Sequence, residues 1–298
     1  MSYTFAVAGL PAPTRLDRAL QAHQPAWGRS AVRGLIEGRQ VRVNGRPVWL
    51  CSWQVHNGDR IELLALPEAK PQPFEHFDDA WIIAEEPDLA AVDKPAGLLS
   101  ESPRWREAGN LLDLARQRFG PVHLFHRLDR DTSGVVLLTR NAAINHYLDA
   151  AFKQGAVEKE YLAVVAAPNQ LQAEGVIRLP IGRHPTRRDM MAVVETGGQR
   201  AVTRYRVIHA GPAQQWLRLW PETGRTHQLR VHLAYLDAPI LGDRLYHPDA
   251  RGAPRLMLHA SRISLPASAA HPQRAYVAPT PPEFLPPPAE VGQMGEVG

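Results

Sequence analysis

The stretch HRLDRDTSG, residues 126–134, combines residue types that could do chemistry. Asp129 and Asp131 alternate with Arg127 and Arg130, and a Thr-Ser-Gly turn leads into the apolar run VVLL. Such a carboxylate pair could hold a metal ion, form a structural ion pair or present one carboxylate as a nucleophile. The arginines disfavour a metal, because they oppose cation binding and a metal would need further oxygen ligands. A fixed arginine would instead keep one carboxylate ionised for covalent catalysis.

A candidate partner for that carboxylate lies far along the chain, in ETGRTHQLRVHLAYLDAPILGDRLY, residues 222–246. Apolar and polar residues alternate in QLRVHL, so the pattern predicts a strand over 228–234 that contains Arg230. A guanidinium in such a strand is partly buried and needs an anion nearby. Asp129 is the obvious candidate, although a purely structural ion pair fits these residue types as well as a catalytic one.

The positions of a tyrosine, the cysteine and two histidines limit the kinds of site that the sequence can form. EKEYLAVV (158–165) places Tyr161 near the start of a predicted strand, where its ring could pack against a base or in the core. Cys51 is the only cysteine, which excludes an internal disulfide and a cysteine metal cluster. His227 and His232 are five residues apart, which places them on the same face of neither a strand nor a helix. The sequence therefore predicts no metal site.

These residues must be positioned by a chain of 298 residues and 33.1 kDa, which suits one large domain or two of unequal size. A hydrophobic content of 44% is ordinary for a soluble protein. The N-terminus lacks a basic segment followed by an apolar core, and no apolar run approaches the ~20 residues that a membrane span needs. We therefore expect a cytoplasmic protein without membrane contact.

The net charge is only +4, but its placement is informative. Residues 1–66 contain four acidic residues, no lysine and eight arginines: Arg15, Arg18, Arg29, Arg33, Arg39, Arg42, Arg46 and Arg60. The whole excess of positive charge therefore lies in this segment. Because guanidinium groups bind phosphate bidentately and stack on bases, such a segment suggests a nucleic-acid partner. A genome rich in G and C would also favour arginine over lysine, so charge alone does not decide.

Periodicity predicts a small domain of helix, helix, hairpin and strand at the N-terminal end. The expected elements are helices over 15–23 and 28–40, a hairpin over 41–48 with Asn-Gly at its turn, and a strand over 58–64. The three prolines of PEAKPQPFEHF indicate a linker over 67–77.

Four arginines of this domain are placed for phosphate contacts. Arg29 and Arg33 share a face of the second helix, and Arg42 and Arg46 flank the hairpin turn. A solvated helix face is the alternative. The sequence pattern RSxxRxLIExxxVxVNG resembles the S-four-like RNA-binding module, and the resemblance covers residues 13–66. One departure is Arg39-Gln40, which stands where that family usually has a glycine-rich approach to the strand.

The rest of the chain predicts a second, larger domain. Helices are expected near 109–118 and around 141–154, and strand-like runs at 160–166, 200–208, 215–220 and 228–234. Antiparallel strands with helices in their connections indicate an α+β domain over residues 78–284. The Pro-rich tail over 285–298 is expected to be poorly ordered.

Five stretches in order resemble the signatures of the large-subunit ribosomal-RNA type pseudouridine synthases, the Rlu family. They are HRLDRDTSGVVLLTR, EKEYLAVV, GGQRAVTRYRV, TGRTHQLRVHLAYLDAPILGDRLY and RLMLHA. The resemblance implies an α+β fold with a mixed, mostly antiparallel sheet. The upstream VDKPAGLLS also resembles the family, but the usual His-Pro-Gly after it is replaced by Glu101-Ser102-Pro103.

Matching the motifs residue by residue carries the family's roles onto this chain. The resemblance makes Asp129 the catalytic aspartate, Tyr161 the active-site tyrosine and Arg230 the arginine that pairs with the aspartate. Arg127 matches the arginine associated with insertion at the vacated base position, and Leu258 an apolar residue that lines the base pocket. Asp131 is then a residue of the turn that presents the catalytic acid.

The implied reaction is isomerisation of uridine to pseudouridine within RNA. It has no redox step and needs no external energy, so neither cofactor nor metal is expected. The expected partner is RNA, ribosomal RNA in preference to transfer RNA, and the expected state is a monomer. The aspartate could attack the ribose, attack the pyrimidine or remove a ribose proton. The rivals are a non-catalytic RNA-binding or ribosome-assembly factor and a metal-dependent glycosyl- or phosphotransferase.

Overall fold

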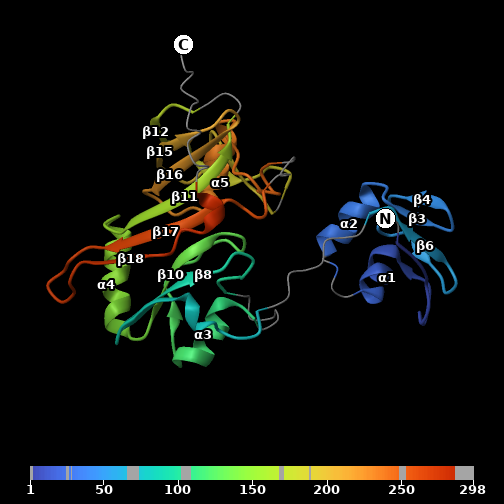
Figure 1. Ribbon diagram of the computed structural model, residues 1–298, viewed down its shortest axis with the longest axis horizontal. Helices are drawn as coiled ribbons and strands as arrows, with labels where there is room; N and C mark the ends of the chain where they lie inside the picture. Colours follow the sequence, from blue (N-terminus) through green and yellow to red (C-terminus); the bar gives the residue numbers. More distant parts are fainter. Residues whose placement is uncertain are drawn as a thin grey trace, which may run out of the picture. The chain divides into compact units, whose positions relative to one another are not determined.

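A computed structural model describes residues 3–24, 27, 29–65, 74–101, 109–167, 171–187, 189–247 and 253–285. The chain divides into two compact units, residues 1–72 and 73–298 (Figure 1). Most of the expected linker, and the expected tail beyond Leu285, lie outside the described residues. Phe74 and Phe77 pack against Trp81, so the second unit begins before the expected boundary at residue 78.

The first unit is the expected helix, helix, hairpin and strand arrangement, with short strands added. Its elements are β1 (Tyr3–Ala6), β2 (Thr14–Arg15), α1 (Leu16–His23), α2 (Arg29–Glu37), β3 (Val41–Val43), β4 (Arg46–Val48), β5 (Gln54–Val55) and β6 (Arg60–Leu63). Four of the strands form a sheet in the order β1-β6-β3-β4, and β2 pairs with β5. Asn44 and Gly45 have φ values of 49° and 80°, as a type I′ hairpin turn requires. The predicted hairpin is therefore confirmed.

The first half of the second unit supplies strands and the two helices that cover them. Its elements are a 3₁₀ turn (Asp79–Trp81), β7 (Ile82–Glu85), β8 (Leu89–Lys94), α3 (Leu111–Phe119), β9 (His123–Leu124), β10 (Ser133–Thr139), α4 (Ala142–Lys153) and β11 (Glu158–Ala166). Asn110 and Asn141 are the N-cap residues of α3 and α4. Each side chain accepts a hydrogen bond from the backbone N–H three residues further along the chain.

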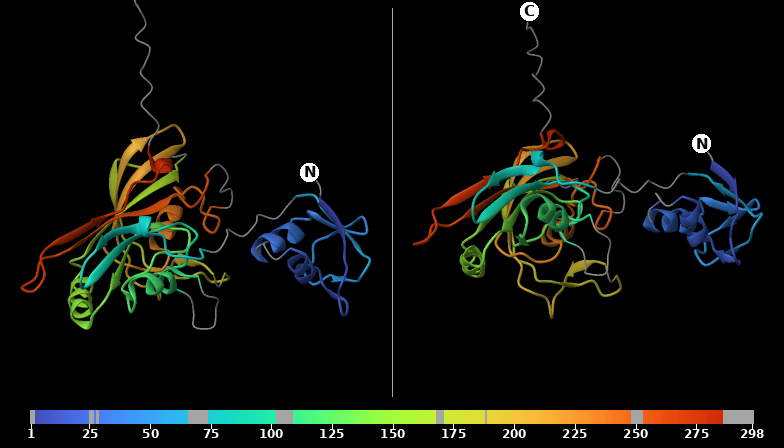
Figure 2. Two further views of the ribbon diagram at one scale, coloured as in Figure 1. Left: turned by 60° about the horizontal axis from the view of Figure 1, so that its bottom comes forward. Right: turned by 90° about the horizontal axis from the view of Figure 1, so that it is seen from below.

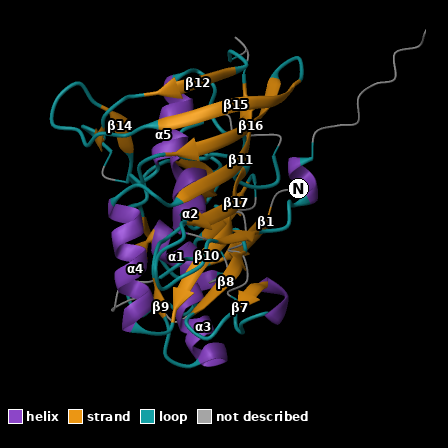
Figure 3. Ribbon diagram, turned by 90° about the vertical axis from the view of Figure 1, so that its left-hand side faces the viewer, coloured by secondary structure: helices purple, strands orange, loops and turns teal. Residues whose placement is uncertain are grey.

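The second half completes the sheet. Its elements are β12 (Glu174–Ile177), β13 (Ile181–Arg183), β14 (Met191–Val193), β15 (Thr203–Ala210), β16 (Gln214–Pro221), α5 (Gln228–Tyr235), β17 (Leu258–Leu265), β18 (Arg274–Val277) and a 3₁₀ turn (Pro282–Phe284). The main sheet runs β12-β15-β16-β11-β17-β10-β8-β7, with β18 beside β17 and β9 beside β10 (Figure 3). Its pairs are antiparallel except β10 with β17. The predicted mixed, mostly antiparallel sheet is confirmed.

Strand β10 is buried on both faces, which explains the run VVLL that follows the acidic motif. Val135 and Leu137 join the apolar cluster of α4, whereas Val136 and Leu138 join the cluster of α3. A strand covered on both sides reads as a continuous apolar run. The acidic motif is therefore anchored at the start of the best-buried strand of the unit. The separate hairpin β13–β14 lies apart from this sheet (Figure 2).

The predicted strand over 228–234 is wrong, because these residues form helix α5. The alternation of Leu229, Val231 and Leu233 with polar residues was misleading, since the polar side chains are buried too. Gln228 Nε2 donates to the Val202 carbonyl at 3.0 Å, and the His232 ring lies 2.9 Å from Thr203 Oγ1. In this segment the alternation of apolar and polar residues therefore does not separate buried side chains from exposed ones. None of the helices in the described ranges could cross a membrane.

Gly134, at the start of β10, allows a close backbone approach between β10 and β17. Its φ is 114°, and a Cβ there would lie 2.2 Å from the Ala260 carbonyl oxygen on β17. We expect Gly134→Ala to lower the unfolding free energy by about 3 kcal/mol or more, because it combines overpacking with backbone strain. Urea unfolding would measure this. Gly34→Ala, on the open surface of α2, is the control and should be neutral or slightly stabilising; equal loss in both variants would contradict the packing argument.

Candidate active site

The loop between β9 and β10 that carries Asp129 is fixed by bonds to its backbone. Ser100 Oγ donates to the Leu128 carbonyl at 2.8 Å and accepts from Leu128 N–H at 3.1 Å. Lys94 is fully buried, and its Nζ donates to the carbonyl oxygen of Arg130 at 2.9 Å. Because these bonds hold the residues on either side of Asp129, the aspartate is presented in one orientation.

Lys94 is a buried amine that stabilises the loop. Its Nζ also donates to the carbonyl oxygens of Pro95 and Leu98, at 2.9 and 2.7 Å. Burial lowers the pKa of Lys94 to about 7, and the charges of Asp131 and Asp129 oppose that shift. Three carbonyl acceptors match the three donors of an ammonium group. Lys94 therefore ties the segment after β8 to the loop of Asp129.

The ion pair expected between Asp129 and Arg230 is present. Arg230 Nη1 donates to Asp129 Oδ2 at 3.0 Å, and the aspartate side chain is 29% exposed. His227 Nε2 lies 3.8 Å from the same oxygen. No bond within the described parts of the chain is made to Oδ1. One carboxylate oxygen is thus held by the guanidinium, and the side chain as a whole is partly exposed.

Asp243 is a second partner of Arg230, and the sequence did not identify it. Arg230 Nε and Nη2 donate to Asp243 Oδ2 and Oδ1, at 2.7 and 2.8 Å, and the Asp243 side chain is completely buried. Asp243 Oδ1 also accepts from the backbone N–H of Leu245 and Tyr246. Burial alone would lower the pKa of Arg230, but the bonds to Asp243 and the charges of both aspartates raise it. The guanidinium is therefore a permanent cation with a fixed plane.

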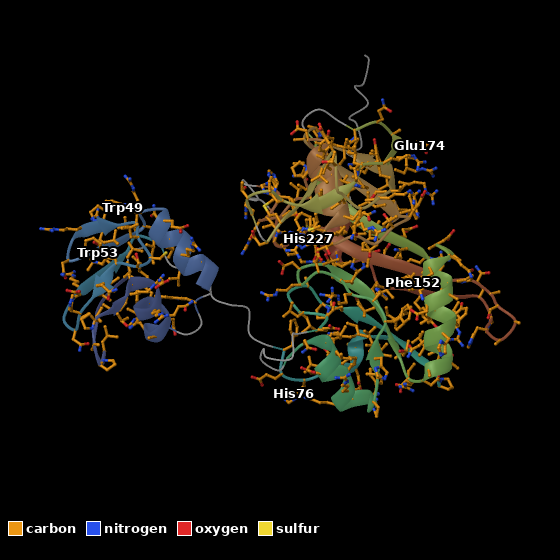
Figure 4. The ribbon with its side chains drawn as sticks, turned by 180° about the vertical axis from the view of Figure 1, so that it is seen from behind. Trp49, Trp53, His76, Phe152, Glu174 and His227 are labelled. Atoms are coloured by element: carbon orange, nitrogen blue, oxygen red, sulfur yellow. The ribbon has the colours of Figure 1, made fainter. Side chains whose placement is uncertain are left out.

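His227, labelled in Figure 4, immediately precedes α5, and its ring lies beside the Asp129 carboxylate. Its φ of 56° is unusual for a residue with a side chain. Its Nδ1 lies 2.8 Å from the Tyr246 hydroxyl, which accepts from the Met191 N–H at 2.9 Å. Burial lowers the pKa of His227, against the opposing charge of Asp129. This arrangement favours a neutral ring whose remaining proton is on Nε2, on the side of Asp129.

Two cavities of about 720 Å³ each share the residues around the Asp129 carboxylate. Both are lined by Arg127, Leu128, Asp129, His227 and Arg230. The second is also lined by two further expected site residues, Tyr161 and Leu258. Its basic lining residues are Lys153, Lys159, Arg200 and Arg225. A cavity of this size, apolar on one part and basic on another, suits a nucleotide with its phosphates.

Tyr161 reaches the cavity from a β-bulge. The register of β11 against β17 shifts between Glu160 and Leu162, and a bulge of this kind re-aims the side chain at that point. Burial raises the pKa of Tyr161, and the charge of Asp129 raises it further, so the hydroxyl stays protonated. Leu258 begins β17 and is 4% exposed, which makes it a buried apolar wall.

Arg127 and Asp131 lie at the mouth of the site. Arg127 is 69% exposed at its side chain, and its Nη1 lies 3.8 Å from Glu101 Oε1. Such a loose surface pair leaves the arginine able to move. Asp131 is exposed in the turn that Thr132 N–H closes onto the Asp129 carbonyl at 3.2 Å. This is the turn position that the sequence predicted for Asp131.

The four arginines expected to bind RNA belong to the first unit. Arg33 forms an exposed ion pair with Glu37 at 2.7 Å, and Arg42 a longer one with Glu62 at 3.7 Å. Arg46 is exposed beside the hairpin turn, and the side chain of Arg29 lies outside the described residues. Exposed pairs of this kind contribute little to stability, so they do not prevent phosphate binding.

Asp243, His227 and Lys94 are the site residues that sequence reasoning did not assign. Asp243 stands in the quoted GDRLY stretch, but its separation of 13 residues from Arg230 follows neither helical nor strand periodicity. Lys94 stands in VDKPAGLLS, where nothing in the pattern marks it as buried. Within the described ranges, no three His, Cys, Asp or Glu side chains gather as metal ligands would.

Comparison with known proteins agrees with this fold. The sequence model of the RNA pseudouridylate synthase family matches residues 88–235, and that of the S4 domain matches residues 14–61. The chain belongs to the RNA pseudouridylate synthase family and is an enzyme that isomerises uridine to pseudouridine in RNA.

Among the curated relatives are proteins named ribosomal large subunit pseudouridine synthase D. The protein of Nitrosomonas europaea is 35% identical over 269 residues, which cover 84% of this chain and 76% of the relative. That of Haemophilus ducreyi is 33% identical, over 78% of this chain and 72% of the relative. The solved structure of human RNA pseudouridylate synthase domain containing 1 is 29% identical, with a TM-score of 0.57, over 67% of this chain and 83% of that one.

Proposed function

We propose that this enzyme modifies specific uridines of large-subunit ribosomal RNA and that Asp129 is its catalytic group. The names of the relatives support this RNA class. The observation that carries the catalytic assignment is the position of Asp129, which is bound at one oxygen by Arg230 and lines both cavities. We further propose that the enzyme acts as a monomer in the cytoplasm, where ribosomal RNA is found.

The reaction requires the target uridine to leave its stack, which costs a few kcal/mol. In the proposed mechanism Arg127 moves into the vacated position and offsets part of that cost. Tyr161 stacks on the flipped base, a contact worth ~1–3 kcal/mol in single-strand binders. Leu258 forms the apolar wall of the pocket, and Lys159 and Arg225 contact phosphates.

The chemical step exchanges one bond for another. The bond from ribose C1′ to uracil N1 breaks, the uracil turns within the pocket, and a bond from C1′ to C5 forms. The proton on C5 is then lost and N1 gains one, so the atoms balance without oxidant, reductant or cofactor. Asp129 Oδ1 is the oxygen that acts, because Oδ2 is held by Arg230. The guanidinium keeps this carboxylate anionic and aimed.

The proposed target can be tested by mapping pseudouridines in ribosomal RNA from cells with and without the gene. Loss of one or a few large-subunit sites, restored by the parent chain and not by Asp129→Asn, would support the proposal. Loss confined to transfer RNA would overturn the RNA class while leaving the chemistry intact.

The first unit is proposed to supply affinity and targeting, while the chemistry belongs to the second. A chain starting at Pro73 should keep slow turnover on a short target fragment but bind RNA more weakly. Its affinity should also depend less on salt, because each lost contact on a single strand removes about 0.7 from the slope of log K against log salt. Titrations at several salt concentrations and rates at saturating RNA would measure both effects. An unchanged affinity and slope would show that the N-terminal arginines are only a solvated surface.

A further inference from the structure

The four-stranded sheet of the first unit has one face that helices α1 and α2 do not cover. Both helices pack on the face that carries Val41, Val48 and Leu63. Side chains alternate along strands, so the residues between these positions point to the other face. Arg42 of β3 pairs with both Pro47 of β4 and Glu62 of β6, and all three lie on this uncovered face. We call it the open sheet face.

Trp49 extends the open sheet face past the end of β4. It follows buried Val48 and is 51% exposed, and Figure 4 shows it at the surface of the unit. Leu64, which is 38% exposed, lies at the same end of the sheet as Trp49. Its N–H donates to the carbonyl of Gln40, the residue just before β3. The Arg39 guanidinium lies 5.2 Å above the Trp49 ring. A large exposed ring with a cation over it is a ready stacking surface.

The backbone of Arg39 belongs to the turn that ends α2, in which the Arg39 N–H donates to the Ile36 carbonyl and the Gln40 N–H to the Leu35 carbonyl. Its φ is 58°, in the left-handed region that favours glycine, just after α2. Glycine would adopt this conformation without strain, whereas a residue with a side chain adopts it at a cost. This turn places the Arg39 side chain over Trp49.

The charge of the open sheet face identifies its partner. Arg39, Arg42 and Arg60 lie on it or at its end, and Glu62 is the acid among them, 3.7 Å from Arg42. A positive surface with an exposed indole suits a nucleic acid whose bases are unstacked. A protein docking site would instead be expected to place its aromatic residues in an uncharged centre.

We propose that the open sheet face binds an unpaired segment of the target RNA, with one base stacked on Trp49 and the backbone held by Arg39, Arg42 and Arg60. This proposal rests on the RNA-modifying function but concerns a surface outside the cavities of Asp129. It gives the first unit a second mode of contact, besides phosphate contacts from the helix and hairpin arginines.

The test uses the full chain and two probes, a 12-nucleotide single-stranded RNA and a duplex of the same length. Trp49→Ala should weaken single-strand binding roughly 5-fold or more, as expected for the loss of one stacked base. Trp49→Phe should restore most of the affinity, because a benzene ring still stacks. Leu50→Ala is the matched control, since Leu50 is 52% exposed in the same segment. Duplex binding should change little in any variant.

Arg39→Gly separates binding from folding. Glycine relieves the left-handed strain, so the unfolding midpoint should stay the same or rise while single-strand affinity falls several-fold. Unchanged affinity in both Trp49→Ala and Arg39→Gly would overturn the proposal, as would equal losses for duplex and single strand. A shift of Trp49→Ala toward a different oligomeric state, with RNA affinity unchanged, would identify the face as a protein contact instead. Turnover at saturating RNA should match the parent in all these variants, so failure here is distinguishable from failure of the proposed function.

Discussion

Replacing Asp129 by asparagine is expected to reduce the rate of pseudouridine formation by at least about 10³-fold, since a positioned acid–base group alone contributes ~10²–10⁴-fold. The amide keeps an oxygen that can accept from Arg230 Nη1, so the loop and the ion-pair geometry should survive. It can act neither as nucleophile nor as base. RNA affinity should remain within a few-fold of the parent. Single-turnover rates at saturating RNA, with affinity measured separately, would check both expectations.

Asp131→Asn is the matched control for that experiment. Asp131 is exposed in the same turn and is two residues away, so the change in charge is identical. We expect it to keep most of the activity. Equal loss at both positions would revive a role for the pair as metal ligands, and activity in excess chelator would then decide. Appreciable turnover by Asp129→Asn would remove Asp129 from the chemistry.

Replacing Arg230 by alanine should cost both stability and activity. Its removal leaves the buried Asp243 carboxylate, as far as the described residues go, with the backbone donors of Leu245 and Tyr246 alone. Breaking a buried pair in this way costs ~3–5 kcal/mol of unfolding free energy. Asp129 loses its fixed donor at the same time, so turnover should fall even where the variant is folded. Urea unfolding and rates below the unfolding midpoint would measure the two effects.

A double variant distinguishes the structural loss from the functional one. In Arg230→Met with Asp243→Asn the buried charge is gone from both sides, and the amide oxygen can still accept from Leu245 and Tyr246 N–H. Stability should recover in part, because an uncharged replacement of a buried pair is often neutral. Activity should stay low. A stable double variant with normal turnover would show that Arg230 is only a structural residue.

Local patterns in the sequence predicted several parts of the site. Asn44-Gly45 identified the hairpin of the first unit, and the run at 160–166 identified β11, which carries Tyr161. The need of a buried guanidinium for an anion pointed from Arg230 to Asp129 across 101 residues. These predictions succeeded because each depends on a few neighbouring residues or on a strong electrostatic requirement.

The parts that failed depend on tertiary burial. Helix α5 was predicted as a strand, because its buried polar residues are satisfied by β15 and neighbouring segments that the sequence does not identify. Asp243 was not assigned, since a contact between a helix and a distant loop has no sequence period. The bulge that turns Tyr161 into the cavity depends on the register with β17, which only the assembled sheet fixes.

The central claim is that Asp129 isomerises uridine within RNA. Formation of pseudouridine replaces the hydrogen on uracil C5 by the ribose, so tritium at C5 must pass to water. The most direct measurement is tritium release from a large-subunit ribosomal RNA transcript labelled at C5, incubated with the parent chain and with Asp129→Asn. We predict stoichiometric release by the parent and none above background by the variant. Equal release by both proteins, or none by the parent on any ribosomal RNA fragment, would contradict the account.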